Sequence, residues 1–226
     1  MSKNDKISWK LHSEATTDQF ATNEISLGPW TSYSLIHDPK HVCFVLSRYK
    51  FCSKLLAGKG RVLEIGCGDG IGIPLMAQSV KQLHCIDWDE RNIQGNLRRL
   101  SILKNVTYEY LDITEQKPKD IYDAALSIDV LEHIEPSQED AFLTNICQTL
   151  SPSGVLIIGT PNKNASLYAT KRSDIQHINL KTAEEFYQLI GKYFFNCFIF
   201  SMNDEVVHTG FYPMAHYLLA LCVGKK

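Results

Sequence analysis

The stretch Arg61-Val-Leu-Glu-Ile-Gly-Cys-Gly-Asp-Gly-Ile-Gly72 joins a short apolar run to four alternating glycines. The run over 61–65 is typical of a buried strand, and the glycines predict a tight turn leading into a helix that ends near Val80. Glycine accepts left-handed backbone angles and lets a ligand approach the bare chain. The stretch therefore predicts a strand, a ligand-binding turn and a helix, in that order.

Strand-like and helix-like segments alternate around this turn. Apolar runs predict further strands over 83–86, 106–110, 122–127, 155–158, 197–201 and 216–222. Helical spacing predicts helices over about 40–56, after Asp87, from Pro136 to Leu150 and after Thr182, which opens a capping box. Five β–α units followed by two strands predict an α/β protein, with helices on both faces of an open parallel sheet. Ligands of such sheets bind at the carboxyl ends of the strands.

Length and composition narrow the class of protein. The 226 residues are 44% hydrophobic and 21% charged, which suits one substantial core. Lys+Arg number 23 and Asp+Glu 25, so the chain lacks the broad basic surface of a polynucleotide-binding protein. The seven cysteines form no CxxC pair, which argues against a disulfide framework and a zinc site. We expect a cytoplasmic protein with no membrane span, no nucleic-acid partner and no metal.

The glycine pattern argues against two common phosphate-binding loops. A dinucleotide fingerprint would need its third glycine at position 71 or 73, where Ile71 and Ile73 stand, and no Gly-Lys-Ser/Thr of a Walker loop follows. Asp87 instead ends the second expected strand. A carboxylate there offers two acceptors side by side for the two hydroxyls of a ribose.

The segment that begins at Glu64 resembles the first motif of class I S-adenosylmethionine-dependent methyltransferases, an acidic residue followed by alternating glycines. Further motifs of that family follow in the same order. The resemblance implies S-adenosylmethionine as cofactor and S-adenosylhomocysteine as product. It also implies a Rossmann-like, mostly parallel seven-stranded sheet with an antiparallel last strand.

Specific roles carry over to the matching positions. The resemblance assigns Asp87 to the ribose, Trp88 to stacking on adenine, Asp112 and Ile113 to the adenine amino group, and residues 128–130 to the methionine moiety. The expected cofactor-binding residues are Glu64, Gly66, Cys67, Gly68, Gly70, Asp87, Trp88, Asp112, Ile113, Ile128, Asp129 and Val130. Other interpretations stay open at this point, because such glycines can be purely conformational, such a carboxylate can cap a helix, and Trp88 can belong to the core.

Fewer features of the sequence indicate the methyl acceptor. A hydroxyl acceptor needs a base, for which histidine suits neutral pH, and three histidines are expected near the carboxyl edge of the sheet. In order of preference they are His177, His133 and His208. The segments 1–40 and 161–215 have the length and aromatic content to close over an acceptor. From them we name Tyr33, Asn162, Tyr168, Arg172 and Tyr212 as candidate substrate-binding residues.

Two further segments point to a subset of this family: the turn Gly159-Thr-Pro-Asn162 and the later His177-Ile-Asn179. They resemble ubiquinone-type O-methyltransferases and methyltransferases of sugars, surface glycans and other small metabolites. We therefore expect an N-terminal helical lid over 1–40, a methyltransferase domain over 41–226, and a monomer or homodimer. The expected reaction moves a methyl group to an O or N atom of a small polar metabolite, with a sugar or glycan precursor as one candidate. The alternatives are a protein or RNA methyltransferase with a partner subunit, and a non-catalytic S-adenosylmethionine-binding regulator.

Overall fold

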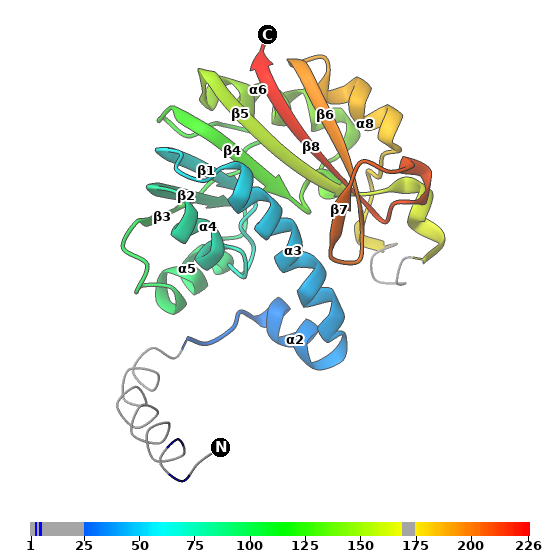
Figure 1. Cartoon of the computed structure of the whole chain (residues 1–226). Helices are drawn as coiled ribbons and strands as arrows, with labels where there is room; N and C mark the ends of the chain where they lie inside the picture. Colours follow the sequence, from blue (N-terminus) through cyan, green and yellow to red (C-terminus); the bar gives the residue numbers. More distant parts are fainter. Residues whose placement is uncertain (1–2, 4, 6–24, 169–174) are drawn as a thin grey trace.

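A computed structural model describes residues 3, 5, 25–168 and 175–226. Within these residues eight strands form one sheet in the order β3-β2-β1-β4-β5-β8-β6-β7 (Figure 1). The strands are β1 (Arg61–Ile65), β2 (Gln82–Asp87), β3 (Val106–Tyr110), β4 (Tyr122–Ile128), β5 (Leu150–Pro161), β6 (Phe194–Asn203), β7 (Val206–His208) and β8 (Tyr217–Lys225). The α-helices are α2 (Pro29–His37), α3 (Pro39–Leu55), α4 (Ile73–Ser79), α5 (Glu90–Arg99), α6 (Glu139–Thr149) and α8 (Ala183–Ile190).

The sheet is parallel from β3 through β5, and β8 runs antiparallel between β5 and β6. The expected mixed sheet with an antiparallel last strand is therefore confirmed. The sequence did not predict the short β7, which pairs with β6 and is the eighth strand of the described residues.

Helices cover both faces of the sheet, as expected. Figure 1 shows α3, α4 and α5 on one side and α6 and α8 on the other. One buried cluster lies under α6 and α8 and includes Phe142, Ile146 and Phe186. The second lies under the other three helices and includes Tyr49 and Met76. Strands β1 and β4 contribute to both clusters because successive side chains point to opposite faces.

Three local expectations differ from the structure. The third β–α unit has no helix, because the described residues 111–121 form turns between β3 and β4. Leu150, expected on a helix, begins β5, and the Ser151–Gly154 segment lies within that strand where the pairing with β4 shifts register. The helix expected from Pro136 begins as a 3-10 turn, η2 (Pro136–Gln138), before α6.

The capping box at the start of α8 is present: the Thr182 hydroxyl accepts the Glu185 N–H, and the Glu185 carboxylate accepts the Thr182 N–H. The parallel strands β1, β2 and β4 end at one edge of the sheet. The loops that follow them therefore lie together.

Candidate active site

The glycine loop after β1 is held in left-handed backbone conformations. Gly66, Gly68 and Gly70 have φ values of +70°, +52° and +84°. A Cβ on Gly66 would lie 2.4 Å from Cγ2 of Val130, whereas a Cβ on Gly68 would meet no atom within 4 Å. The need for glycine at position 66 is therefore explained by internal packing. Gly68 borders open space, so a ligand can approach its backbone.

Asp87 faces this loop from the end of β2. Its Oδ2 accepts the Gly68 N–H at 2.8 Å, and its Oδ1 accepts the Asp89 N–H at 2.8 Å. The residue is 5% exposed, and burial raises the pKa of its carboxyl. Trp88 beside it is 69% exposed, which excludes a place in the core. The structure thus brings together a bare glycine backbone, a carboxylate and an exposed indole.

Glu64 supports the glycine loop from the protein interior. It is buried, and its carboxylate accepts the Tyr49 hydroxyl at 2.9 Å and the Cys85 thiol at 3.6 Å. Burial raises the pKa of Glu64 to about 7. Cys67 is also buried, and Asn96 donates to its Sγ and to the Gly68 carbonyl oxygen. Glu64 and Cys67 therefore brace the loop rather than face solvent.

The other expected cofactor residues follow β3 and β4. The Asp112 carboxylate accepts both the N–H and the hydroxyl of Thr114. Ile113 and Ile128 are buried and belong to opposite clusters of the core. Val130 packs against the Gly66 backbone.

Asp129 has an arrangement that the sequence did not reveal. It is a non-glycine residue with φ +59°, and its carboxylate pairs with Arg48 of α3 at 2.5 Å. The Arg48 guanidinium lies 3.8 Å from the ring centroid of Tyr217, whose hydroxyl oxygen accepts the Asp129 N–H. The buried Arg48 Nε has no hydrogen-bond partner among the described residues. Eighty-one positions separate Arg48 from Asp129, so no local motif could have indicated the pair.

The structure brings two of the three candidate histidines together. The rings of His133 and His177 lie 5.2 Å apart between centroids, in an edge-on arrangement. His208 lies elsewhere, in the β6–β7 hairpin, where it contacts the Asn203 Oδ1 and accepts the Gly210 N–H.

A buried carboxylate, Glu132, lies beside the two histidines. It accepts the Thr160 hydroxyl at 3.2 Å. Burial and the charge of Asp129 raise the pKa of Glu132 well above its ordinary value. One ligand atom from each of Glu132, His133 and His177 lies within 4.8 Å of the others.

The candidate acceptor residues are scattered. Tyr33 lies half exposed on α2, and Tyr168 is 81% exposed on the 3-10 turn η3 (Lys163–Tyr168). Asn162 is buried and donates to the backbone oxygens of Tyr212 and Ala215, which fastens the end of β5 to the segment before β8. The half-buried Tyr212 donates to the Ile199 carbonyl. Arg172 lies outside the described residues.

Helix α2 is tied directly to the glycine loop. The Asp69 carboxylate accepts the Thr31 N–H at 2.7 Å and the Thr31 hydroxyl at 2.8 Å. Gly28, at the N-cap position, supplies no side-chain cap of its own. Asp69 therefore caps α2 from outside the helix, in the geometry that an N-cap carboxylate normally provides from within.

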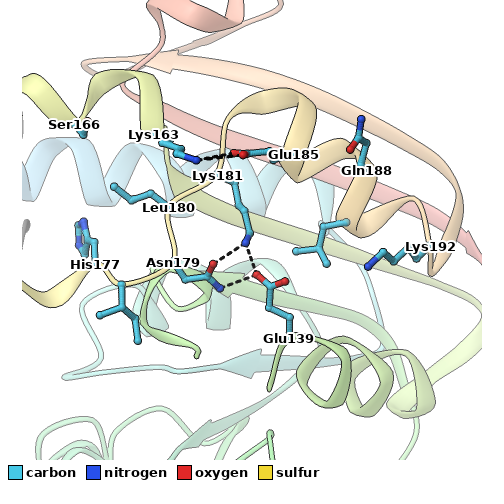
Figure 2. Close-up of a pocket in the computed structure, with 12 residues that line it drawn as sticks. Glu139, Lys163, Ser166, His177, Asn179, Leu180, Lys181, Glu185, Gln188 and Lys192 are labelled. Atoms are coloured by element: carbon cyan, nitrogen blue, oxygen red, sulfur yellow. Dashed lines mark hydrogen bonds and ion pairs between the residues drawn. The ribbon is translucent and has the colours of Figure 1, made fainter. Parts of the chain in front are cut away.

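A cavity of about 600 Å³ lies between η3, α8 and the segment 177–181. Its charged groups are mostly paired: Figure 2 shows Lys181 pointing at Asn179 and Glu139, and Lys163 at Glu185. No glycine-loop residue lines it, and it shares only His177 with the histidine pair. We therefore place the candidate active site at the glycine loop and the post-β4 turn rather than in this cavity.

Comparisons with known proteins identify the family of the chain. A family model described as a methyltransferase domain matches residues 37–197. The ubiquinone biosynthesis O-methyltransferase of Rickettsia canadensis is 33% identical over 127 residues, which cover 55% of this chain and 50% of that protein. The enzyme of the same name from Rickettsia akari is 29% identical over 145 residues, which cover 61% of this chain and 55% of that protein. The chain thus spans about half the length of the curated relatives it matches.

Solved structures share the fold. The N-methyltransferase NodS from Bradyrhizobium japonicum, in complex with S-adenosyl-L-homocysteine, has a TM-score of 0.63 at 20% identity, covering 86% of this chain and 92% of NodS. That identity supports a common fold and nothing finer. Among the described residues, none of the helices is both long and apolar enough to cross a membrane.

Proposed function

Because the chain belongs to the methyltransferase domain family and has the class I fold, we propose that it transfers a methyl group from S-adenosylmethionine to an oxygen atom of a small polar acceptor. The observation that carries the proposal is the open backbone of Gly68 opposite the Asp87 carboxylate, a cradle that side chains leave free. Oxygen is preferred to nitrogen because curated relatives of the chain are named O-methyltransferases.

The residues present fit this cofactor. We assign the ribose hydroxyls to the Asp87 carboxylate, which lies against the glycine loop, and adenine to the exposed Trp88. Asp112 follows the end of β3. We assign the buried Arg48 Nε, which lacks an acceptor among the described residues, to the methionine carboxylate of the cofactor. When bound, S-adenosylmethionine supplies a methyl group made electrophilic by the sulfonium.

On the acceptor side, the post-β4 turn supplies the polar groups. We assign removal of the acceptor's hydroxyl proton to the pair His133 and His177, which lies on this turn and the segment packed against it. Sugar or glycan precursors and hydroxylated ring compounds are the two acceptor classes to compare. The first was expected from sequence, and the second is suggested by the names of the relatives.

The N-terminal segment is proposed as a lid over this site. Helix α2 lies against the glycine loop through Thr31 and Asp69, and α3 carries Arg48 to Asp129. The boundary expected at residue 40 falls at the start of α3. The lid proposed for 1–40 therefore includes α2, which ends just before that boundary.

Asp87→Asn tests the cofactor site, and Asp89→Asn is the matched control because Asp89 caps α5 through Arg91. We expect calorimetry to show S-adenosylhomocysteine binding weakened at least about tenfold in Asp87→Asn, because charged hydrogen bonds contribute about 1.5–3 kcal/mol each. The control is expected to bind like the wild type. A wild-type protein that binds neither S-adenosylmethionine nor its product would overturn the proposal.

Transfer of tritiated methyl groups in a cell lysate tests the acceptor class. Label in the small-molecule fraction, separated into sugar and ring compounds, is the expected result. Label confined to macromolecules would support a protein or RNA substrate and contradict a small acceptor. Binding without any transfer would support the non-catalytic regulator.

A further inference from the structure

Two cysteines lie directly opposite each other on neighbouring strands of the sheet. Cys197 of β6 pairs with Cys222 of β8 in the antiparallel register. Directly opposed residues of antiparallel strands have side chains on the same face and Cα atoms about 4.5–5.5 Å apart. A disulfide needs Cα atoms roughly 4.4–6.8 Å apart. The backbone therefore holds these two free thiols at a separation that a disulfide can bridge.

The two thiols differ in their access to solvent. Cys197 is half buried and lines a surface pocket of about 370 Å³. The Lys226 side chain lines the same pocket, where its Nζ lies 5.6 Å from the ring centroid of Phe195. Cys222 is fully buried in the cluster under α6 and α8. A small oxidant can therefore reach the sulfur of Cys197 before that of Cys222.

The two thiols also differ in their acidity. The hydrogen bond with Cys222 lowers the pKa of Cys197 and outweighs the opposing effect of burial, and the charge of Lys226 adds to the lowering. The same hydrogen bond, together with burial, raises the pKa of Cys222 well above its ordinary value. The thiolate is the reactive form of cysteine, and reactive thiols are typically partly exposed and close to a cation. Cys197 is thus the nucleophile of the pair.

A second pair of neighbouring thiols provides a contrast. Cys67 of the glycine loop and Cys85 of β2 also share a hydrogen bond, which lowers the pKa of Cys67, but burial and the charge of Glu64 outweigh it and leave that pKa raised. Cys85 is buried as well, and burial raises its pKa well above the ordinary value. Buried thiols of this kind are inert. The pair Cys67 and Cys85 therefore serves as an internal control for proximity without reactivity.

We propose that Cys197 is a peroxide-reactive thiol and that Cys222 converts its oxidised form into a reversible disulfide between β6 and β8. In the first step the Cys197 sulfur attacks one oxygen of hydrogen peroxide. The S–O bond of a sulfenic acid forms, the O–O bond breaks, and the released hydroxide becomes water with the proton that Cys197 has lost.

In the second step the Cys222 sulfur attacks the sulfenic sulfur of Cys197. The S–S bond forms, the S–O bond breaks, and the hydroxide leaves as water with the Cys222 proton. The two sulfurs together lose the two electrons that the peroxide gains, and a dithiol reductant returns both thiols. The disulfide thereby protects Cys197 from irreversible oxidation to sulfinic acid. Neither cysteine belongs to the candidate active site, so this proposal goes beyond methyl transfer and is independent of it.

Treatment of the reduced full chain with hydrogen peroxide tests the proposal. After the peroxide is removed, N-ethylmaleimide blocks the free thiols, and mass spectrometry of the digested protein maps the disulfides. The proteins are the wild type, Cys197→Ser, Cys222→Ala and the control Cys147→Ser. Cys147 lies on α6 and packs against the same core cluster as Cys222, so the control removes a neighbouring sulfur and keeps the pair. Circular dichroism and urea unfolding check that each variant is folded.

We expect the wild type and Cys147→Ser to form the disulfide between Cys197 and Cys222, which dithiothreitol reverses, while Cys67 and Cys85 stay reduced. Cys197→Ser is expected to leave Cys222 as a thiol. Cys222→Ala is expected to accumulate sulfenic acid at Cys197, trapped by dimedone, and then sulfinic acid, because no second thiol resolves it.

The rate of oxidation gives a further check. In the wild type Cys197 should react at least about threefold faster than Cys43, an exposed cysteine on α3. Equal or slower oxidation of Cys197, a first disulfide between Cys67 and Cys85, or a disulfide from Cys197 to Cys147 or to a second copy of the chain would each overturn the proposal. So would a wild type in which peroxide leaves both Cys197 and Cys222 as thiols.

Discussion

At the scale of single residues, the glycines of the loop after β1 serve two different needs. Gly66 and Gly70 have no room for a side chain, because Val130 and Asn96 occupy the space where a Cβ would stand. Gly68 has that room and still takes a left-handed conformation. Among the loop glycines with positive φ, only Gly68 therefore combines a left-handed backbone with an opening that a ligand can use.

Gly68→Ala and Gly58→Ala form a matched pair that separates these needs. Both glycines have positive φ, +52° and +79°, and neither Cβ would meet an atom within 4 Å. We expect each substitution to lower the free energy of unfolding by about 1–2 kcal/mol, the cost of a left-handed alanine. Only Gly68→Ala is expected to weaken S-adenosylhomocysteine binding, at least about tenfold, because its methyl group projects where the ligand approaches. Urea unfolding and calorimetry measure the two effects, and equal affinities would contradict a role for Gly68 in the site.

The candidate site residues that the sequence could name lie in one local motif. Glu64, the alternating glycines and Asp87 were predicted because a strand, a turn and the next strand tip are each visible in linear order. Arg48 and Tyr217 were missed because their partner, Asp129, is distant in the chain. Contacts of that kind are set by packing of α3 and β8 on the sheet, which residue patterns do not encode.

At the scale of elements, helix α2 depends on a residue that does not belong to it. Its own N-cap position is Gly28, and the Asp69 carboxylate of the glycine loop takes over the capping bonds to Thr31. The sequence predicted short helices before residue 40 and could not show this external cap. Likewise, Leu150 follows the apolar spacing of α6, yet backbone pairing with Tyr122 places it in β5.

Asp69→Ala is expected to loosen α2. Loss of a capping carboxylate costs about 1–2 kcal/mol, so hydrogen exchange of the amides over 29–37 should quicken about tenfold. Asp38→Ala is the control, because Asp38 occupies the N-cap position of α3 without making a capping bond. If α2 is part of a lid, the Asp69 variant also loses affinity for S-adenosylhomocysteine. Unchanged exchange over 29–37 would show that the Asp69 contact does not hold the helix.

At the scale of the whole molecule, the alternation of strands and helices predicted the sheet and both of its covered faces. The predictable part is the part built from repeated β–α units, in which the pairs β1–β2, β2–β3 and β4–β5 join strands that follow one another in the chain. The edge strand β7 and the helix-free connection over 111–121 escaped prediction, because a three-residue strand and an irregular turn carry no periodicity.

The stability of the whole molecule should carry the pH signature of one buried acid, Glu64. Its pKa is raised by burial to about 7 in the folded protein, against about 4.3 in an unfolded chain. At pH values between these two pKa values, Glu64 is therefore protonated in the folded state and ionised in the unfolded state. This contribution to stability is fully present below about pH 4.3 and is lost as the pH rises through about 7.

Glu64→Gln removes this titration while keeping an oxygen that can accept the Tyr49 hydroxyl. We expect the variant to gain on the order of 3 kcal/mol in unfolding free energy relative to the wild type between pH 4.5 and pH 8, since each pKa unit corresponds to about 1.4 kcal/mol. Urea unfolding at both pH values measures the change, with Glu115→Gln, an exposed glutamate, as control. Contributions from all other groups cancel in the difference between proteins. A difference that stays constant with pH would mean that Glu64 is charged in the folded state, stabilised by neighbours that outweigh its burial.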